Sequence, residues 1–245
     1  MRLLGKMMWV ETKLFLREPL TVLFSMILPL TILFVMGGVF GNTVEAGFYR
    51  GMGPMDYYTP AYMALVAASV GLISLPTHLA EDRERGVLKR YRASSFPAWT
   101  VVGSQVLVTA LIALVSALIL VSVAMPVYAV VSPHSILRVA VGFVSVALAS
   151  CSLGVLLGAV LPSPRSAQAL GVMLWFVMLM VGGAGPPPEA LSATMNNMGK
   201  LTPLHHAVRV MQDGWLGLDA GCSWVVIGIV ALGCGVAAIR LFRWE

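Results

Sequence analysis

The sequence predicts an all-α integral membrane protein with six transmembrane helices. Its 245 residues are 58% hydrophobic and 11% charged, whereas about 25% of the residues of a soluble domain are charged. The apolar residues gather in runs of about 20 or more, which is the length that crosses a bilayer as a helix, and they lack the alternation of a barrel strand. Six such runs fit the chain: Leu20–Phe40, Pro60–Ala80, Val101–Val130, Ile136–Leu161, Ala167–Ala184 and Cys222–Ile239.

Residues 1–19 predict a helix that lies along the membrane surface. When they are projected at 100° per residue, four basic side chains fall within a sector of about 60°, opposite a broad apolar face: Arg2, Lys6, Lys13 and Arg17. Glu11 and Glu18 project into the apolar face. Either they contact a protein partner, with the arginines of residues 81–92 as one candidate, or the helix bends or ends before Glu18 at Pro19.

The distribution of lysine and arginine predicts the orientation of the chain. With the N-terminus inside the cell, 12 of the 16 basic residues fall on the inner side and four on the outer side, and basic residues near span ends are retained in the cytoplasm. Both termini and the loop between the second and third spans are therefore predicted to be cytoplasmic. The net charge of +5 follows from this topology, and no basic patch with interleaved aromatic residues predicts binding to nucleic acid.

Residues 81–98 form the most highly charged loop, which begins "EDRERGVLKRYRASSFP". Within it, residues 81–92, called the elbow below, predict a short helix in which Gly86 allows a bend or a close approach. A solvated loop that satisfies the orientation rule would explain the basic residues but not Glu81, Asp82 and Glu84. Mixed charge next to Val87, Leu88 and Tyr91 instead predicts docking of a soluble protein.

Residues 185–221 predict an external segment that re-enters the membrane without crossing it. The segment is too long and too apolar for a plain loop. Pro186, Pro187 and Pro188 are expected to stop the fifth span, and Pro203 to open another helix. Backbone at this depth needs a cover of protein, so we expect these short helices to cap the exit of a pathway.

The sequence offers little for enzyme chemistry. It contains no phosphate-binding GxxxxGK[ST] loop, no HExxH and no paired carboxylates within the spans. The adjacent His205 and His206 point about 100° apart on a helix, which suits a shared metal poorly, and the three cysteines are expected to be packing residues. We expect no cofactor or metal in this chain. The spans also lack the ionisable residues of an ion relay.

Two motifs resemble the permease subunits of ABC-2 type ATP-binding cassette exporters. "ERGVLKRYRASSFP" is similar to the family's charged run after the second span, which continues as Gly-Thr-Leu-Lys or similar and ends near a proline, although Val87 stands at the usual threonine. "LTPLHHAVRVMQDGWLG", residues 201–217, looks like the proline-led segment before the last span. With six spans and a cytoplasmic N-terminus, the resemblance covers nearly the whole chain.

The resemblance implies one transmembrane domain over residues 1–245 in a bacterial plasma (inner) membrane, paired with a second permease chain as a homo- or heterodimer. Separate ATP-binding cassette ATPase subunits would bind ATP and magnesium and drive export of an amphipathic or hydrophobic substrate, such as a drug, a lipid or a glycan-like molecule. The family's coupling role falls here on Glu84, Arg85, Gly86, Leu88 and Lys89. Substrate contacts at the dimer axis would come from Ser69, Ser74, Trp175, Phe176 and Met178, which helix packing explains equally well.

Two other classes of function remain open from the sequence. An ion-coupled secondary transporter or channel would respond to an ion gradient, and a membrane-embedded enzyme, such as an intramembrane protease, would act without a partner. An activity that requires a co-purifying ATPase would distinguish the exporter from both.

Overall fold

The computed structural model describes residues 9, 12–13, 23–44, 47–88 and 98–241, and all regular structure in these residues is helical. In this part of the chain, six helical segments are long and apolar enough to cross a membrane: Leu23–Phe40, Pro54–Glu84, Val102–Tyr128, Ile136–Val160, Pro164–Val181 and Ser223–Leu241. The prediction of an all-α protein with six spans is confirmed. Glu11, Glu18 and most of the expected surface helix lie outside the described residues.

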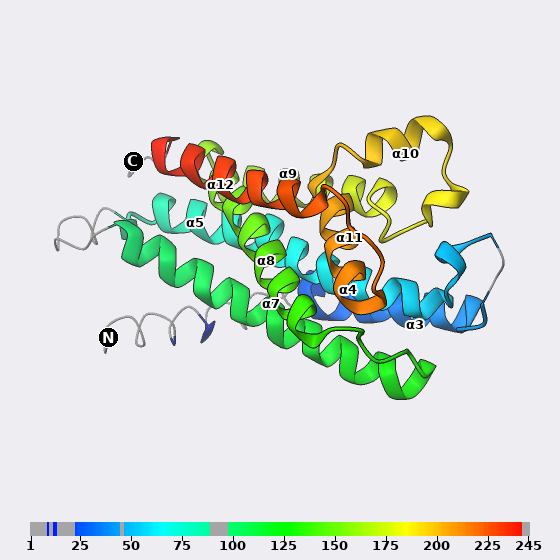
Figure 1. Cartoon of the computed structure of the whole chain (residues 1–245). Coiled ribbons are helices and arrows are strands. Elements are labelled where there is room, and N and C mark those ends of the chain that lie inside the picture. The colour runs from blue at the N-terminus through cyan, green and yellow to red at the C-terminus, as the bar shows by residue number, and fades with distance from the viewer. Residues whose placement is uncertain (1–8, 10–11, 14–22, 45–46, 89–97, 242–245) are drawn as a thin grey trace.

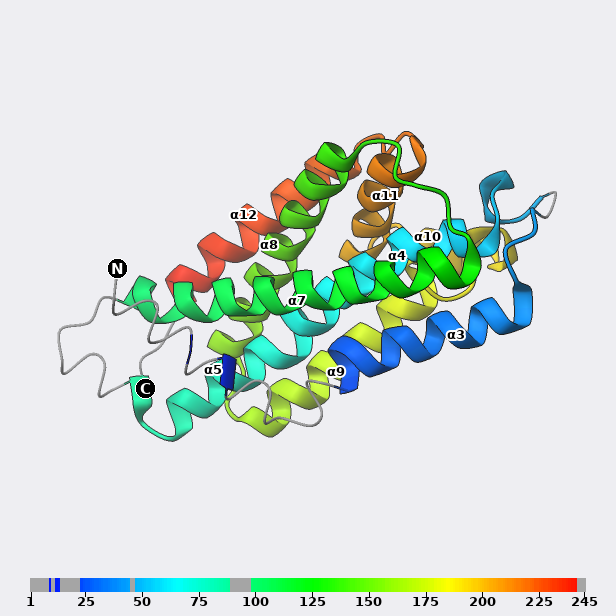
Figure 2. The ribbon, with the colours of Figure 1, turned by 90° about the horizontal axis from the view of Figure 1, so that it is seen from below.

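The spans are built from named helices (Figures 1 and 2). The first comprises η1 (Leu23–Ile27) and α3 (Leu28–Phe40), and the second comprises α4 (Pro54–Ser69), η3 (Val70–Ser74) and α5 (Leu75–Glu84). The other four are α7 (Ala98–Tyr128), α8 (Ile136–Val160), α9 (Pro164–Val181) and α12 (Ser223–Leu241). Within the described residues, four short helices lie between the spans: η2 (Tyr49–Gly51), η4 (Pro188–Ala190), α10 (Ala193–Gly199) and α11 (Pro203–Leu216). In Figure 1, α10 and α11 lie away from the end of the molecule that carries α5 and the C-terminal end of α12.

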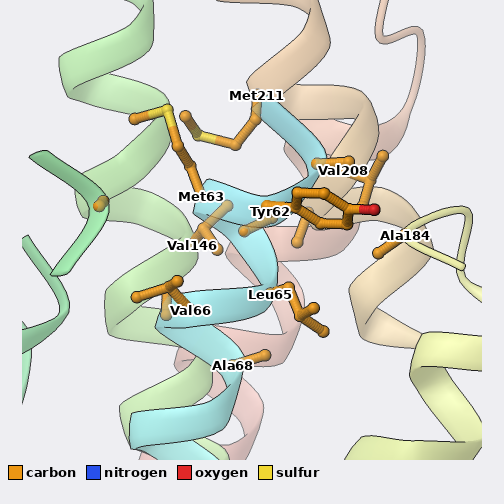
Figure 3. Close-up of a cluster of buried hydrophobic side chains, with 14 of the residues drawn as sticks. Tyr62, Met63, Leu65, Val66, Ala68, Val146, Ala184, Val208 and Met211 are labelled. Atoms are coloured by element: carbon orange, nitrogen blue, oxygen red, sulfur yellow. The ribbon is translucent and has the colours of Figure 1, made fainter. Parts of the chain in front are cut away.

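The second span lies at the centre of the molecule. In its most apolar stretch, 94% of the residues are buried, compared with 11 to 44% in the corresponding stretches of the other five spans. The second span packs against α3, α7, α8, α9 and α11. The surrounding helices keep apolar outer faces exposed, as contact with lipid requires. Figure 3 shows the core that α4 forms with α8 and α11, which includes Tyr62, Met63, Val146, Val208 and Met211.

The helix type changes near the midpoint of the second span. Pro76 has no N–H for the carbonyl of Leu72, and a proline ring crowds the carbonyl four residues earlier. The chain accommodates this with the wider π-helical turns of η3. Gly171 of α9 lies against the Leu72 carbonyl, where a Cβ atom would overlap the oxygen. The absence of a side chain at Gly171 thus allows α9 to approach this carbonyl closely.

Two boundaries differ from the predicted ones. The second span runs from Pro54 to Glu84, so the first four residues of the elbow continue the helix of the span instead of belonging to a separate short helix. Helix α9 ends at Val181, where Gly182 caps it and Gly183 adopts a left-handed φ of 88°. Glycine, and not the Pro186–Pro188 run expected from the sequence, therefore stops the fifth span.

The segment before the last span contains the expected helix that opens at Pro203. Thr202 precedes it as the N-cap, and its side chain accepts a hydrogen bond from the His205 N–H at 3.4 Å. At 1.5 Å per residue, the 14 residues of α11 reach about 21 Å, less than the roughly 30 Å of the bilayer core. One face of α11 is buried against α4 and α8. That this segment dips into the membrane stays a prediction.

Candidate functional site

The described part of the elbow, residues 81–88, closes the end of the second span. It lies where α7 begins, α8 and α12 end and α9 begins, at the end of the molecule opposite α10 (Figure 2). Because the second span is one continuous helix up to Glu84, this part of the elbow is attached directly to the core.

Gly86 turns the chain at the end of α5. Its φ is +69°, a left-handed conformation that glycine adopts without strain. The Arg85 N–H donates to the Glu81 carbonyl at 2.8 Å and the Gly86 N–H to the Arg83 carbonyl at 3.1 Å, so the turn closes the helix. A Cβ atom at Gly86 would have no neighbour within 4 Å in this chain. Of the two roles predicted for Gly86, the structure therefore shows the bend.

Glu81 and Arg85 form an ion pair of 3.3 Å, one turn apart on the solvent side of the elbow. The Arg85 side chain is 68% exposed, and such pairs contribute less than about 1 kcal/mol to stability. Glu84 is also exposed. The side chains of Glu84 and Arg85 are therefore open to a partner, as the coupling role predicted for them requires.

Asp82, which follows Glu81, makes a contact inside the chain. The Asp82 Oδ2 atom accepts a hydrogen bond of 2.6 Å from Nε2 of the buried Gln105 on α7. Asp82 thus ties the second span to the third, and one of the three acidic residues taken as signs of docking forms a contact inside the chain.

Arg83 binds the end of α8. Its guanidinium donates to the carbonyls of Gly158, at 3.1 Å, and Ala159, at 3.3 Å, and also to that of Leu161. The last carbonyls of a helix have no partner within the helix, and they carry a partial negative charge that favours a cation. From the sequence, Arg83 is expected to orient the chain and, with the other arginines of the elbow, is a candidate partner of Glu11 and Glu18; a contact with the end of α8 is not predicted. The sequence does indicate that Asp82 and Arg83 have different partners, because adjacent residues of a helix point about 100° apart and must face different neighbours.

Leu88 is 1% exposed and hence buried in this chain. Its side chain therefore packs within this chain and is not open to a partner, which differs from the coupling contact that the resemblance implies for it. Lys89 lies outside the described residues.

Two hollows lie beside the elbow, and together with it they form a larger surface. The first is lined by Arg83, Glu84, Ala159, Val160, Leu161, Pro162 and Leu241. The second is lined by Glu81, Glu84, Arg85, Ser163, Pro164 and Arg165. Glu84 borders both hollows, so the elbow and the turn between α8 and α9 present one continuous surface.

The five residues predicted to contact substrate do not share a surface. Ser69, Ser74, Trp175 and Met178 are buried, with at most 8% exposed. The Ser69 hydroxyl donates to the Val66 carbonyl of its own helix at 2.8 Å. Phe176 is 54% exposed. Of these five residues, Phe176 alone is open to an adjacent molecule in a single copy of the chain.

An apolar groove runs between the first span and α9. Its walls are Phe24, Leu28, Ile32, Ala169, Val172, Met173, Trp175, Phe176 and Leu179. The Trp175 ring meets the Phe24 ring edge-on, with centroids 5.5 Å apart. Trp175 and Phe176 are thus the two predicted substrate residues that border this groove.

Among the described residues, no three His, Cys, Asp or Glu side chains gather as they do around a metal ion. The rings of His205 and His206 are nearly perpendicular, with centroids 5.3 Å apart. Burial lowers the pKa of His205 to about 4, and nearby positive charges, including Arg209, add to the effect. His205 is therefore neutral at pH 7.

A family comparison supports the same class of protein. The family model described as ABC-2 type transporter matches residues 2–216. A comparison with curated proteins gives no significant match. The family implies a partnership with an ATP-binding subunit, and the sequence of this chain has no phosphate-binding loop of its own. The chain therefore belongs to the ABC-2 type transporter family, as a multi-pass permease subunit.

Proposed function

We propose that this chain is the permease subunit of an exporter that moves an amphipathic or hydrophobic substrate, such as a drug, a lipid or a glycan-like molecule, out of the cytoplasm. A separate subunit binds ATP and magnesium and supplies the energy. The observation that carries the proposal is the continuity of the second span, whose buried centre extends as helix to the exposed Glu84.

The elbow faces the cytoplasm of a bacterial cell in this proposal, together with both termini. The charge pattern supports this orientation, because 12 of the 16 lysines and arginines then lie on the cytoplasmic side. The orientation puts the elbow surface within reach of a cytoplasmic ATPase.

The elbow transmits force along the second span. Its 31 helical residues extend about 45 Å at 1.5 Å per residue, more than the thickness of the bilayer core. Glu84 and Arg85 meet the ATP-binding subunit, while Leu88 and Arg83 hold the elbow to the permease. A push on the exposed residues therefore reaches the centre of the molecule through a single helix.

A second permease chain, identical or related, completes the pathway. The apolar groove between the first span and α9 supports this arrangement, because a second copy there would cover the exposed Phe176 and enclose the groove between two chains. Such a wall suits apolar parts of a substrate. At the opposite end, α11 would lie in the outer leaflet and cap the exit, its backbone covered by α4 and α8.

Co-expression with an ATP-binding subunit tests the proposed function. We expect the tagged full-length chain to retain that subunit through purification in mild detergent. The reconstituted complex should hydrolyse ATP and drive uptake of a fluorescent amphipathic dye into inside-out vesicles. Replacing the phosphate-loop lysine of the ATP-binding subunit should abolish uptake without dissociating the complex. Uptake driven by a proton or sodium gradient without ATP would contradict the proposal.

A further inference from the structure

We infer that Arg83 is a positioning residue that locks the elbow to α8, so that a movement of the second span carries α8 with it. This inference deepens the proposed function and rests on it. It assigns the transfer of motion to a residue that the ATP-binding subunit does not need to touch.

The contact of Arg83 joins two different spans. Its guanidinium donates to three carbonyls at the end of α8, those of Gly158, Ala159 and Leu161. The last turn of α8 contains no basic residue of its own, and Leu161 leaves the helix in an extended conformation. Arg83 thus supplies to this helix end the donors and the positive charge that its own sequence lacks.

The guanidinium suits this task better than an ammonium group would. Its donors form a planar fork that can bind several oxygens at once, whereas a lysine presents a single point charge on a flexible stem. Arg83 is therefore expected to fix both the position and the angle of the elbow relative to α8.

Close backbone packing continues the same interface toward the middle of the membrane. Gly154 of α8 lies against the Gly71 carbonyl, where a Cβ atom would overlap the oxygen. One turn further along α8, a Cβ atom at Gly158 would lie 2.9 Å from Leu79 Cδ2 and 3.1 Å from Pro76 Cα. The two spans interlock from their centres to the elbow, and Arg83 closes this contact at its end.

A neighbouring arginine provides a natural contrast. Arg85 pairs with Glu81 of its own helix and is 68% exposed, so this ion pair connects no two spans. Arg83 and Arg85 carry the same charge two residues apart, but only Arg83 makes hydrogen bonds to α8 among the described contacts. A substitution at Arg85 therefore controls for the loss of positive charge.

The far end of α8 is tied to α11. The His134 N–H donates to the Trp215 carbonyl at 2.8 Å, and the Ser135 N–H donates to the Gly214 carbonyl at 3.0 Å. Asp213 pairs with Arg138 of α8 at 3.5 Å and accepts a hydrogen bond of 2.8 Å from Trp224 of α12. A shift of α8 imposed through Arg83 would thus reach the helix proposed to cap the exit.

Distance measurements on the complex test this inference. Spin labels are attached through Val39→Cys on α3 and Leu137→Cys on α8, both at exposed positions, in a background without Cys151, Cys222 and Cys234. The labelled chain, with its ATP-binding subunit in lipid nanodiscs, is compared without nucleotide and after trapping with ATP and vanadate. We expect trapping to change the distance between the labels in the otherwise unaltered chain.

We expect Arg83→Ala to abolish this nucleotide-dependent change while the complex still hydrolyses ATP. Arg83→Lys should keep part of it, and Arg85→Ala should keep all of it. The role of Arg83 is overturned if Arg83→Ala shows the full change, or if Arg85→Ala loses as much. It is also overturned if both Arg83 variants melt at lower temperature and lose the ATP-binding subunit, because that result indicates a purely structural contact. A complex without any nucleotide-dependent change in the unaltered chain would contradict the proposed function itself.

Discussion

Replacing Gly154 by leucine should largely remove the protein from the membrane. A side chain at this position would overlap the Gly71 carbonyl, and neither backbone can withdraw without moving a span that is 94% buried. Overpacking a well-packed core costs about 1–3 kcal/mol and more where backbone must move, against a total stability of about 5–15 kcal/mol. The measurement is the amount and the melting temperature of monodisperse protein after extraction in mild detergent.

Gly228 of α12 provides the matched control. It is also a helical glycine, but a Cβ atom there would meet nothing within 4 Å. Gly228→Leu should therefore be extracted in the same amount as the unaltered protein. If Gly154→Leu were as abundant and as stable as Gly228→Leu, the close packing of the second span on α8 would be wrong.

Replacing Gly86 by valine should leave the permease in the membrane but weaken its hold on the ATP-binding subunit about tenfold. The position has free space but a φ of +69°, and a left-handed conformation costs a residue with a Cβ roughly 1–2 kcal/mol, with β-branched side chains disfavoured most. An elbow that relaxes this strain changes its angle and loses its fit, and 1.4 kcal/mol corresponds to a tenfold change in affinity. The measurement is the amount of ATP-binding subunit retained per permease chain over a dilution series.

Gly86→Asn separates backbone conformation from side-chain bulk. Asparagine tolerates the left-handed region better than valine does, so this variant should bind the ATP-binding subunit nearly as well as the unaltered chain. Equal losses for the two variants would show that the partner excludes any side chain at Gly86, and binding by Gly86→Val at the unaltered level would show that the bend has no part in coupling.

The six spans could be predicted from the sequence because their apolar length is a local property that the bilayer imposes. The full length of the second span could not be predicted in this way. The charges of Glu81 to Glu84 predict that the span ends at Ala80 and that a separate short helix follows, yet the span continues through them because Asp82 and Arg83 find partners on α7 and α8. Those partners lie 23 and 75 residues away in the sequence, and no local pattern reveals them.

The exposure of the predicted site residues could be foreseen from the sequence for some of them and not for others, for the same reason. Glu84 and Arg85 are exposed on the elbow as expected, because they lie at the last residue and the C-cap of α5, where the helix leaves the bundle. The resemblance implies a substrate contact for Ser69, but Ser69 satisfies its hydroxyl on its own helix, as serine in a helix commonly does. Whether a leucine such as Leu88 faces its own chain or a partner depends on the tertiary fold alone.

Crosslinking from the elbow tests most directly whether this surface docks the ATP-binding subunit. A benzophenone attached through Glu84→Cys, in a chain free of other cysteines, is activated by light in the assembled complex, and Thr194→Cys on α10 serves as the exposed control at the opposite end. The proposed coupling predicts a crosslink to the ATP-binding subunit from position 84 and none from position 194. A complex that forms but crosslinks only from position 194, or from neither position, would contradict it.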